Sequence, residues 1–85
     1  AIENAGVTPG RDILVLSVDG TKKALTAIKE GRMNCSVECN PLLGPELLKV
    51  VEDVVAGNQV PRRIYIDEQL FDKDNVDSWI EERSY

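Results

Sequence analysis

Two acidic residues in this 85-residue sequence each follow a segment with the pattern of a β-strand. Asp19 closes the apolar run "ILVLSV" and is followed by Gly20 and Thr21. Glu38 ends a second strand pattern, within "NCSVECNPLLGP". In sheets of parallel strands joined by helices, ligands bind beside the carboxyl ends of the strands. We therefore expect Asp19 and Glu38 to mark a binding site for a small ligand.

The segments around these two residues predict a strand, a helix and a second strand. Residues 13–18 are mostly apolar and branched, which is typical of a strand buried on both faces of a parallel sheet. Thr21 suits a helix N-cap and Gly31 a helix end, and the inward positions at helical spacing are Ala24, Leu25 and Ile28. The second strand is predicted over residues 34–38. Such units are right-handed and parallel, with neighbouring strands about 4.8 Å apart, so both carboxylates could reach one ligand.

The remainder of the chain predicts two more helices and one more strand. A helix is expected to begin at Gly44-Pro45 and to end at Gly57, with a wide apolar stripe made of Leu47, Leu48, Val51, Val54 and Val55. Ile64 and Ile66 alternate with polar or amphipathic residues, which predicts a third strand that could extend to Leu70. A short last helix is expected with a cap at Asp74 or Asn75 and with inward residues Val76, Trp79 and Ile80.

The first residues, "AIENAG", have the pattern of the last turn of an amphipathic helix that Gly6 ends. The start of such a helix is missing, so we expect the chain to be the C-terminal piece of a longer protein. A chain of this length forms one compact unit at most, because a domain this small buries only about 60% of its unfolded surface.

Composition disfavours several classes of function. The net charge is −5, which repels phosphate backbones and anionic lipids, so we expect no nucleic-acid partner and no membrane-surface binding. The absence of histidine excludes Ser-His, Cys-His and His-metal sites within the chain. The acidic stretch 67–77 lacks the Gly and final Glu of an EF-hand loop and has the pattern of a solvated loop and a helix start. We therefore expect no catalytic residue, no metal site and no cofactor.

The two cysteines, Cys35 and Cys39, are four residues apart in a strand pattern. This spacing separates them by about 13 Å. A disulfide allows at most about 7 Å between the two Cα atoms. We expect them not to pair with each other but to be two small apolar residues on one strand face. The alternative is a bridge from one of them to a part of the protein outside this chain.

The stretch "DILVLSVDGTKKALTAIKEGRMNCSVECNPLLGPELLKVVEDVVAG" resembles the C-terminal end of bacterial solute-binding proteins for sugars, of the ribose-binding type. It is especially similar to the galactofuranose-binding group. The motif "VDG" after a buried strand is by itself weak evidence for this resemblance. Followed by "NCSVECNPLLGP" and by Val60-Pro61, it is more specific.

The resemblance implies an α/β fold: a C-terminal fragment of a two-lobed periplasmic-binding-protein (Venus flytrap) fold with parallel strands alternating with helices. Residues 1–38 would belong to the C-terminal lobe, 39–41 to one crossing, 44–66 to the N-terminal lobe, and 67–85 to a further crossing and the C-terminal helix. By position, Asp19 and Glu38 would accept hydrogen bonds from sugar hydroxyls. The hinge residues would be Cys39, Asn40, Pro41 and Asp67.

The same resemblance implies a function in transport. We expect the substrate-binding component of an ABC-type sugar importer, located in the periplasm or outside the cell, with or without a lipid anchor. Its partners would be a monosaccharide such as galactofuranose and the membrane permease. Related proteins often carry Gln or Asn at the position of Glu38, which leaves the sugar undecided. The isolated chain is expected to bind sugar poorly and to dimerise or swap domains, because its apolar stripe lacks a cover.

Other interpretations remain open at this point. Asp19 could be only the residue of a strand-to-helix turn, and Glu38 only a solvated edge residue. The fold is shared with sugar-responsive sensors and with effector domains of lac-repressor-like transcriptional repressors. A glycosidase is less favoured: two carboxylates about 5 to 9 Å apart suit its chemistry, but nothing in the sequence indicates an acid with a raised pKa beside a nucleophile.

Overall fold

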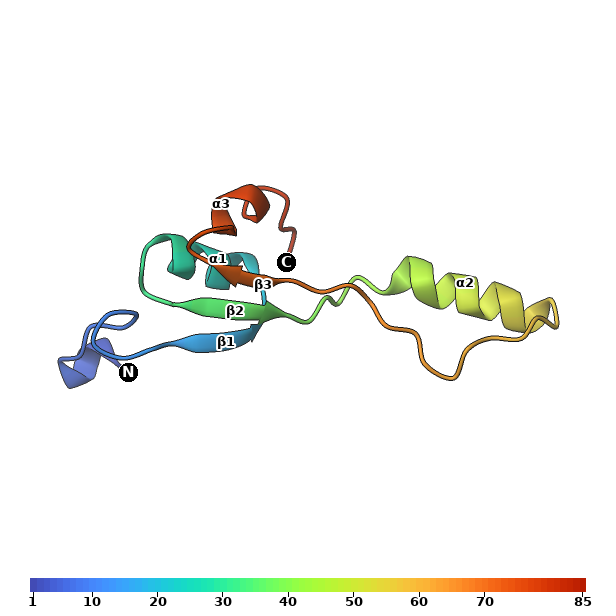
Figure 1. Cartoon of the computed structure of the whole chain (residues 1–85), viewed down its shortest axis with the longest axis horizontal. Coiled ribbons are helices and arrows are strands. Elements are labelled where there is room, and N and C mark those ends of the chain that lie inside the picture. Colours follow the sequence, from blue (N-terminus) through green and yellow to red (C-terminus); the bar gives the residue numbers. More distant parts are fainter.

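The computed structural model describes residues 1–85, which form a body and an arm (Figure 1). We call residues 1–38 and 70–85 the body, because they contain all three strands and the first and last helices. We call residues 39–69 the arm, which contains one long helix and the two segments that join it to the body. The chain measures 59 × 23 × 18 Å along its principal axes, so the arm extends well away from the body.

The body is built on a sheet of three strands in the order β1-β2-β3. β1 (Leu16–Asp19) lies parallel to β2 (Cys35–Glu38), and α1 (Lys22–Lys29) connects them, which confirms the predicted strand-helix-strand unit. The side chain of Thr21 accepts a hydrogen bond from the Ala24 N–H at 3.3 Å, which confirms the predicted cap. β3 (Leu70–Asp72) pairs antiparallel with β2, so the sheet is mixed. The prediction of parallel strands holds for β1 and β2 and is wrong for β3, which returns from the arm and follows no crossover helix.

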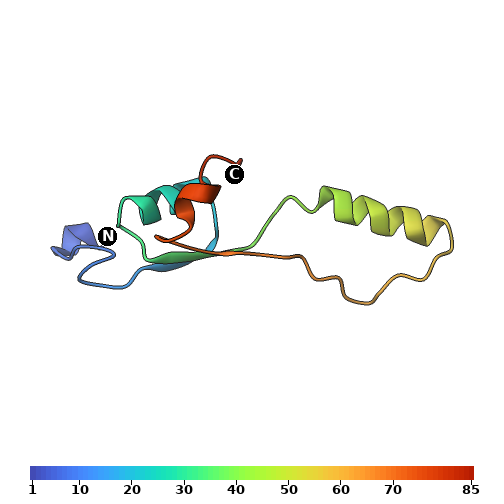
Figure 2. The ribbon, with the colours of Figure 1, turned by 45° about the horizontal axis from the view of Figure 1, so that its top comes forward.

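Only one face of the sheet is covered. α1 and α3 (Val76–Trp79) contact each other and lie on the same side of the strands (Figure 2). Ser36 and Phe71 face these helices and are fully buried, whereas the alternate positions of the strands are exposed: Leu16, Val18, Val37 and Leu70. The prediction that the first strand is buried on both faces is therefore wrong for this chain, because no helix of the chain covers the second face.

The core of the body is small and centred on Phe71. It consists of Leu25, Ile28, Phe71, Val76 and Ile80, with Met33 and Trp79 packed against it. The rings of Phe71 and Trp79 meet edge to face, with centroids 6.0 Å apart. Such pairs contribute about 0.5 to 1.5 kcal/mol beyond the burial of their surface. The inward positions predicted for the last helix are thus confirmed. Asn75 stands at its start, but its side chain does not cap the helix: its Oδ1 accepts from the Asp72 N–H at 3.0 Å.

The turn from β1 to α1 uses two residues with positive φ, Asp19 at 97° and Gly20 at 60°. Gly20 is buried directly against the core: a Cβ at this position would lie 2.7 Å from Phe71 Cε2. The Gly20 N–H donates to the hydroxyl of Ser36 at 3.1 Å, and this hydroxyl also accepts from Ser17 at 2.8 Å. Packing and hydrogen bonds together determine where the end of β1 lies.

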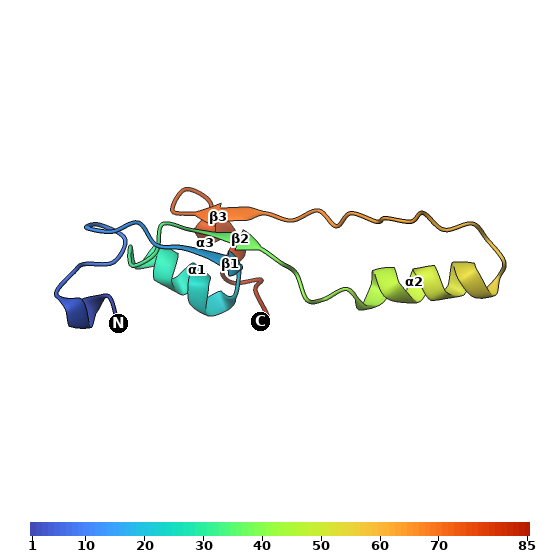
Figure 3. The same ribbon diagram turned by 90° about the horizontal axis from the view of Figure 1, so that it is seen from below.

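The arm contains α2 (Gly44–Val55), whose predicted start at Gly44-Pro45 is confirmed. Gly57, with φ 78°, follows the helix as expected. No residue of α2 is buried, and its apolar stripe is more than half exposed: Leu47, Leu48, Val51, Val54 and Val55. After the helix, the chain runs back beside it towards the body (Figure 3). α2 therefore has no hydrophobic core of its own within this chain.

Of the predicted third strand only Leu70 lies in an observed strand, and the part at Ile64 and Ile66 does not form. Residues 60–68 have no regular secondary structure, and β3 begins only at Leu70. Both isoleucines instead line an apolar groove with Leu43, Leu47 and Val50. An alternating pattern needs a partner strand for its N–H and C=O groups, and no other strand lies on the arm.

The N-terminal residues form a single 3₁₀ turn, Glu3–Ala5. Gly6 ends this turn in the left-handed region with φ 75°, which confirms its predicted role. No helix of the structure is long and apolar enough to cross a membrane.

Candidate functional site

Asp19 and Glu38 are direct partners in the β1–β2 ladder, which confirms the prediction that both lie at the same edge of the sheet. They nevertheless lie in very different surroundings. The side chain of Asp19 is exposed at the carboxyl edge of the sheet, whereas Glu38 is only 6% exposed. One carboxylate is therefore open to a ligand and the other is enclosed by the protein.

Asp19 has an unusual backbone conformation for a residue other than glycine, with φ 97°. Such conformations cost about 1 to 3 kcal/mol each and persist only where the surroundings enforce them. The next residue, Gly20, is buried against Phe71 where the chain turns into α1, and this packing restricts the backbone of the turn. An exposed carboxylate held at a strand end by strained backbone is consistent with a binding residue. The same position, between β1 and α1, is also that of a strand-to-helix turn residue, so the role of Asp19 as a ligand stays a prediction.

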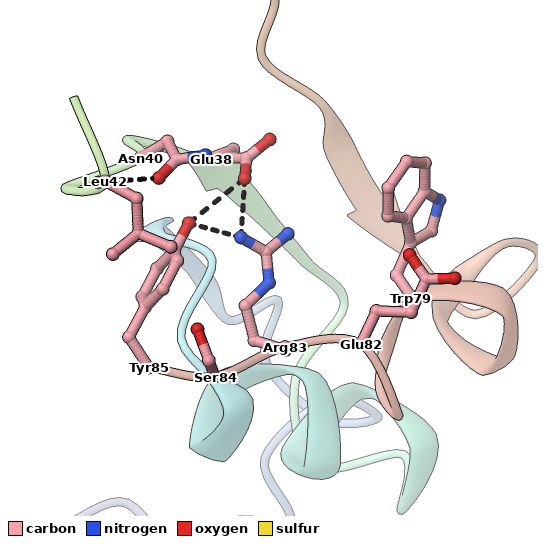
Figure 4. A pocket seen from close by; sticks show the side chains of 8 residues that line it. All are labelled: Glu38, Asn40, Leu42, Trp79, Glu82, Arg83, Ser84 and Tyr85. Carbon is pink, nitrogen blue, oxygen red and sulfur yellow. Dashed lines mark hydrogen bonds and ion pairs between the residues drawn. The ribbon is translucent and has the colours of Figure 1, made fainter. Parts of the chain in front are cut away.

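Glu38 is the centre of a buried hydrogen-bond network (Figure 4). Its Oε1 accepts from Arg83 Nη1 at 2.5 Å and from the Tyr85 hydroxyl at 3.0 Å. Its Oε2 accepts from the Gln69 N–H at 3.0 Å. Three of the roughly four acceptor positions of a carboxylate are therefore used within the chain. This overturns the interpretation of Glu38 as a solvated edge residue.

Arg83 is as buried as Glu38, with both side chains 7% exposed. Its guanidinium carbon lies 4.7 Å from the centre of the Phe71 ring and 4.8 Å from that of Tyr85. Arg83 Nη1 also donates to the Tyr85 hydroxyl. The guanidinium thus contacts two aromatic rings while it neutralises the carboxylate, which compensates in part for its removal from water.

These contacts set the protonation of the network. Burial by itself would raise the pKa of Glu38, but the hydrogen bonds from Arg83, the Gln69 N–H and Tyr85 outweigh it and lower that pKa below its ordinary value of 4.5. Burial and the hydrogen bond to Glu38 raise the pKa of Tyr85. At neutral pH the carboxyl of Glu38 is therefore ionised and the phenol of Tyr85 is neutral.

A small open pocket lies beside this network, with a volume of about 180 Å³. Its lining comes from the start of the arm and from the end of the chain: Glu38, Asn40, Leu42, Trp79, Glu82, Arg83, Ser84 and Tyr85 (Figure 4). Arg83 and Tyr85 were not predicted from the sequence, because "EERSY" has the pattern of a solvated tail and no local signal marks it.

The predicted hinge residues lie where the arm joins the body. Asn40 is half-buried; its N–H donates to Glu68 Oε1 at 3.0 Å, and its Oδ1 accepts from the Leu42 N–H at 2.8 Å. Cys39, Pro41 and Asp67 are exposed. The outgoing and returning segments of the arm are therefore tied together at this point. The role of these residues as hinges stays a prediction.

The two cysteines form no disulfide with each other, and the acidic side chains form no metal-binding cluster. Cys35 and Cys39 are both free thiols, Cys35 half-buried and Cys39 exposed, so they do not bridge each other. No group of three or more His, Cys, Asp or Glu side chains is placed to hold a metal ion.

Comparisons with known proteins identify the family. The fructose import binding protein FruE of Bifidobacterium longum is 35% identical over 72 residues, which cover 85% of this chain and 21% of that protein. The galactofuranose-binding protein YtfQ of Escherichia coli is 33% identical over 64 residues, 75% of this chain and 20% of that protein. This chain belongs to the bacterial sugar-binding proteins of the ribose-binding type. No protein-family model matches the chain.

Solved structures of this family reproduce the fold over the whole chain. A Mycobacterium smegmatis protein in complex with β-D-fucofuranose matches with a TM-score of 0.89 at 42% identity, over 100% of this chain and 28% of that chain. A galactofuranose-binding protein matches with a TM-score of 0.83 at 30% identity, over 98% of this chain and 28% of that chain. The predicted fold class, a fragment of the periplasmic-binding-protein fold, is confirmed.

The match to the Mycobacterium smegmatis protein covers the arm as well as the body, so that longer protein contains a segment with the same extended arrangement. The chain spans about a fifth of the length of the curated relatives that it matches. The exposed apolar faces of the sheet and of α2 are therefore what a segment of a larger family member would show.

Proposed function

We propose that this chain is part of the substrate-binding component of a bacterial ABC-type sugar importer. The observation that carries the proposal is the match over the whole chain to a structure bound to β-D-fucofuranose. Other relatives bear names that mention import or binding of fructose, galactofuranose and ribose. A protein of Shewanella that matches 99% of the chain is the periplasmic component of an arabinose transporter and holds L-arabinofuranose.

The proposed ligand is a monosaccharide in its furanose form, such as galactofuranose. Two of the matched structures hold furanose sugars, and a third is described as a galactofuranose-binding protein. By analogy the whole protein is periplasmic or extracellular, binds one sugar and delivers it to a membrane permease.

Asp19 is the proposed main sugar ligand of this segment. Its carboxylate is exposed at the strand end, and carboxylates accept hydrogen bonds from neighbouring hydroxyls. Each charge-assisted bond contributes about 1.5 to 3 kcal/mol net. Glu38 is the proposed second ligand. Because three donors of the chain already occupy it, we expect it to accept one sugar hydroxyl at most.

The arrangement of body and arm supports a two-lobed protein. Residues 1–38 would belong to one lobe and residues 44–66 to the other. The two crossings, near Cys39 to Pro41 and near Asp67, would act as hinges when the lobes close around the sugar. The absence of any buried residue in α2 supports this division, because α2 needs the remainder of the second lobe to bury its stripe.

The proposed protein binds and releases its sugar without bond chemistry. A glycosidase acid needs a raised pKa, whereas the pKa of the Glu38 carboxyl is lowered. We expect no hydrolysis of aryl glycosides by the purified full-length protein. Hydrolysis that is lost in Asp19→Asn would overturn this part of the proposal.

Calorimetric titration of the full-length protein with a panel of furanose and pyranose sugars tests the proposal. At least one sugar should bind, and Asp19→Asn should raise its dissociation constant about 10- to 150-fold. Asp74→Asn is the matched control, since Asp74 is also exposed but lies beyond β3, away from the strand edge. An unchanged constant in Asp19→Asn would remove Asp19 from the site, and failure of every sugar would refute the function.

A further inference from the structure

We propose that Glu38, Arg83 and Tyr85 form a clamp that fixes the end of the chain to the two crossings and thereby sets the position of the arm relative to the body. Arg83 and Tyr85 are in this view positioning residues and not sugar ligands. The consequence for sugar binding rests on the proposed function, whereas the clamp itself rests on contacts within this chain.

The first observation is where Glu38 lies. Glu38 is the last residue of β2, so the crossing that leads from the body into the arm begins directly after it. It faces Gln69, which ends the crossing that returns from the arm to β3. The Glu38 N–H donates to the Gln69 carbonyl at 2.8 Å, and the Gln69 N–H donates to Glu38 Oε2 at 3.0 Å. Two residues further out, the Asn40 N–H donates to Glu68 Oε1. Glu38 therefore joins both crossings where they leave the body.

The second observation is how the end of the chain is held. Residues 82–85 follow α3 without regular structure, yet Arg83 is buried. Arg83 contacts the core residue Phe71 and ion-pairs with Glu38, while the Tyr85 carbonyl accepts a hydrogen bond from the Lys22 N–H at 2.6 Å. The last residues thus link the start of α1, the core and the crossings. Figure 4 shows the contacts of Arg83 and Tyr85 with Glu38.

The third observation is the type of interaction. A buried ion pair is weak evidence for stability, because removing two charges from water offsets most of their attraction. It does restrict geometry: an arrangement that separates the partners leaves a buried charge without compensation. Placed at the base of the arm, the pair Glu38–Arg83 would penalise any movement of the crossings that moves Glu38 away from Arg83.

Hydrogen exchange of backbone amides tests the clamp directly. In the wild-type protein the amides of Gln69 and Asn40 should be protected, because both donate to carboxylates. Arg83→Met removes the charge while it keeps an apolar side chain of similar length. We expect exchange at Gln69 and Asn40 to rise about tenfold or more in this variant, while the Glu30 amide at the end of α1 changes little.

Tyr85→Phe is the second variant, because it removes one hydrogen bond to Glu38 and retains the ring over Arg83. If Arg83→Met does not fold, the exchange rates of Tyr85→Phe test the clamp in its place. Faster exchange confined to the crossings supports the clamp. An equal rise at Glu30 would show a general loss of stability and would overturn the proposal, as would unchanged exchange at Gln69 and Asn40.

Sugar titration of the same variants separates this proposal from the proposed function. If the wild-type protein binds a sugar, Arg83→Met should weaken binding by about tenfold, because the lobes are less often in the binding geometry. An unchanged dissociation constant for the sugar, together with faster exchange at Gln69 and Asn40, would overturn the proposed effect of the clamp on sugar binding. If no sugar binds to the wild-type protein, the proposed function fails while the exchange experiment still decides the clamp.

Discussion

The buried turn that carries Asp19 makes a sharp prediction for Gly20→Ala. A Cβ at this position would lie 2.7 Å from Phe71 Cε2 and 3.3 Å from Glu38 Cα. Phe71 is fully buried, so it cannot move aside without disturbing the core. Overpacking of this kind costs about 1 to 3 kcal/mol. The positive φ of Gly20 adds about 1 to 2 kcal/mol for any residue with a side chain.

The expected total is a loss of about 2 to 5 kcal/mol in the free energy of unfolding. Gly31→Ala is the matched control, because Gly31 also has a positive φ of 74°, but a Cβ there would meet no atom within 4 Å. It should lose only the backbone contribution of about 1 to 2 kcal/mol.

Urea unfolding of the two variants and the wild-type protein, followed by circular dichroism, measures the difference between them. Gly20→Ala should be less stable than Gly31→Ala by about 1 to 3 kcal/mol, the cost of the contact with Phe71. Equal losses in the two variants would refute the packing of Phe71 under the β1–α1 turn. They would also remove the explanation for the strained backbone at Asp19.

The exposed and buried groups of the chain give three more predictions. The pKa of Glu38 is lower in the folded chain than its ordinary value of 4.5, so its contribution to stability is present above that value and is lost as the pH falls through the folded pKa. Wild-type protein should therefore lose more stability between pH 7 and pH 4 than Glu38→Gln in urea unfolding, and equal losses would contradict the network. Leu48→Lys should reduce dimerisation of the isolated chain in analytical ultracentrifugation, with Lys49→Gln as the control, because Leu48 lies on the exposed stripe of α2; a monomeric wild-type chain would contradict this. Cys39 should react with a thiol reagent faster than Cys35, because only Cys39 is exposed, and Cys39→Ser should remove the fast phase.

Local patterns in the sequence were sufficient for the elements that depend on neighbouring residues. The cap at Thr21, the end of a turn at Gly6 and the start of α2 at Gly44-Pro45 all follow from local backbone chemistry. The alignment of Asp19 with Glu38 could also be predicted, because a parallel strand-helix-strand unit brings both strand ends to one edge. This edge of the sheet is the part of the candidate site that can be predicted from the sequence.

The third strand and the surroundings of Glu38 depend instead on tertiary packing. The alternation at Ile64 and Ile66 predicted a strand, but a strand needs a partner, and pairing with β2 instead involves Leu70–Asp72, where Phe71 fills the core. Arg83 lies 45 residues from Glu38 in the chain. A charged residue in an acidic tail has the local pattern of a solvated group, and it becomes a buried partner only because α3 returns the chain end to the sheet. Contacts between such distant residues depend on how the elements pack, and no local pattern records them.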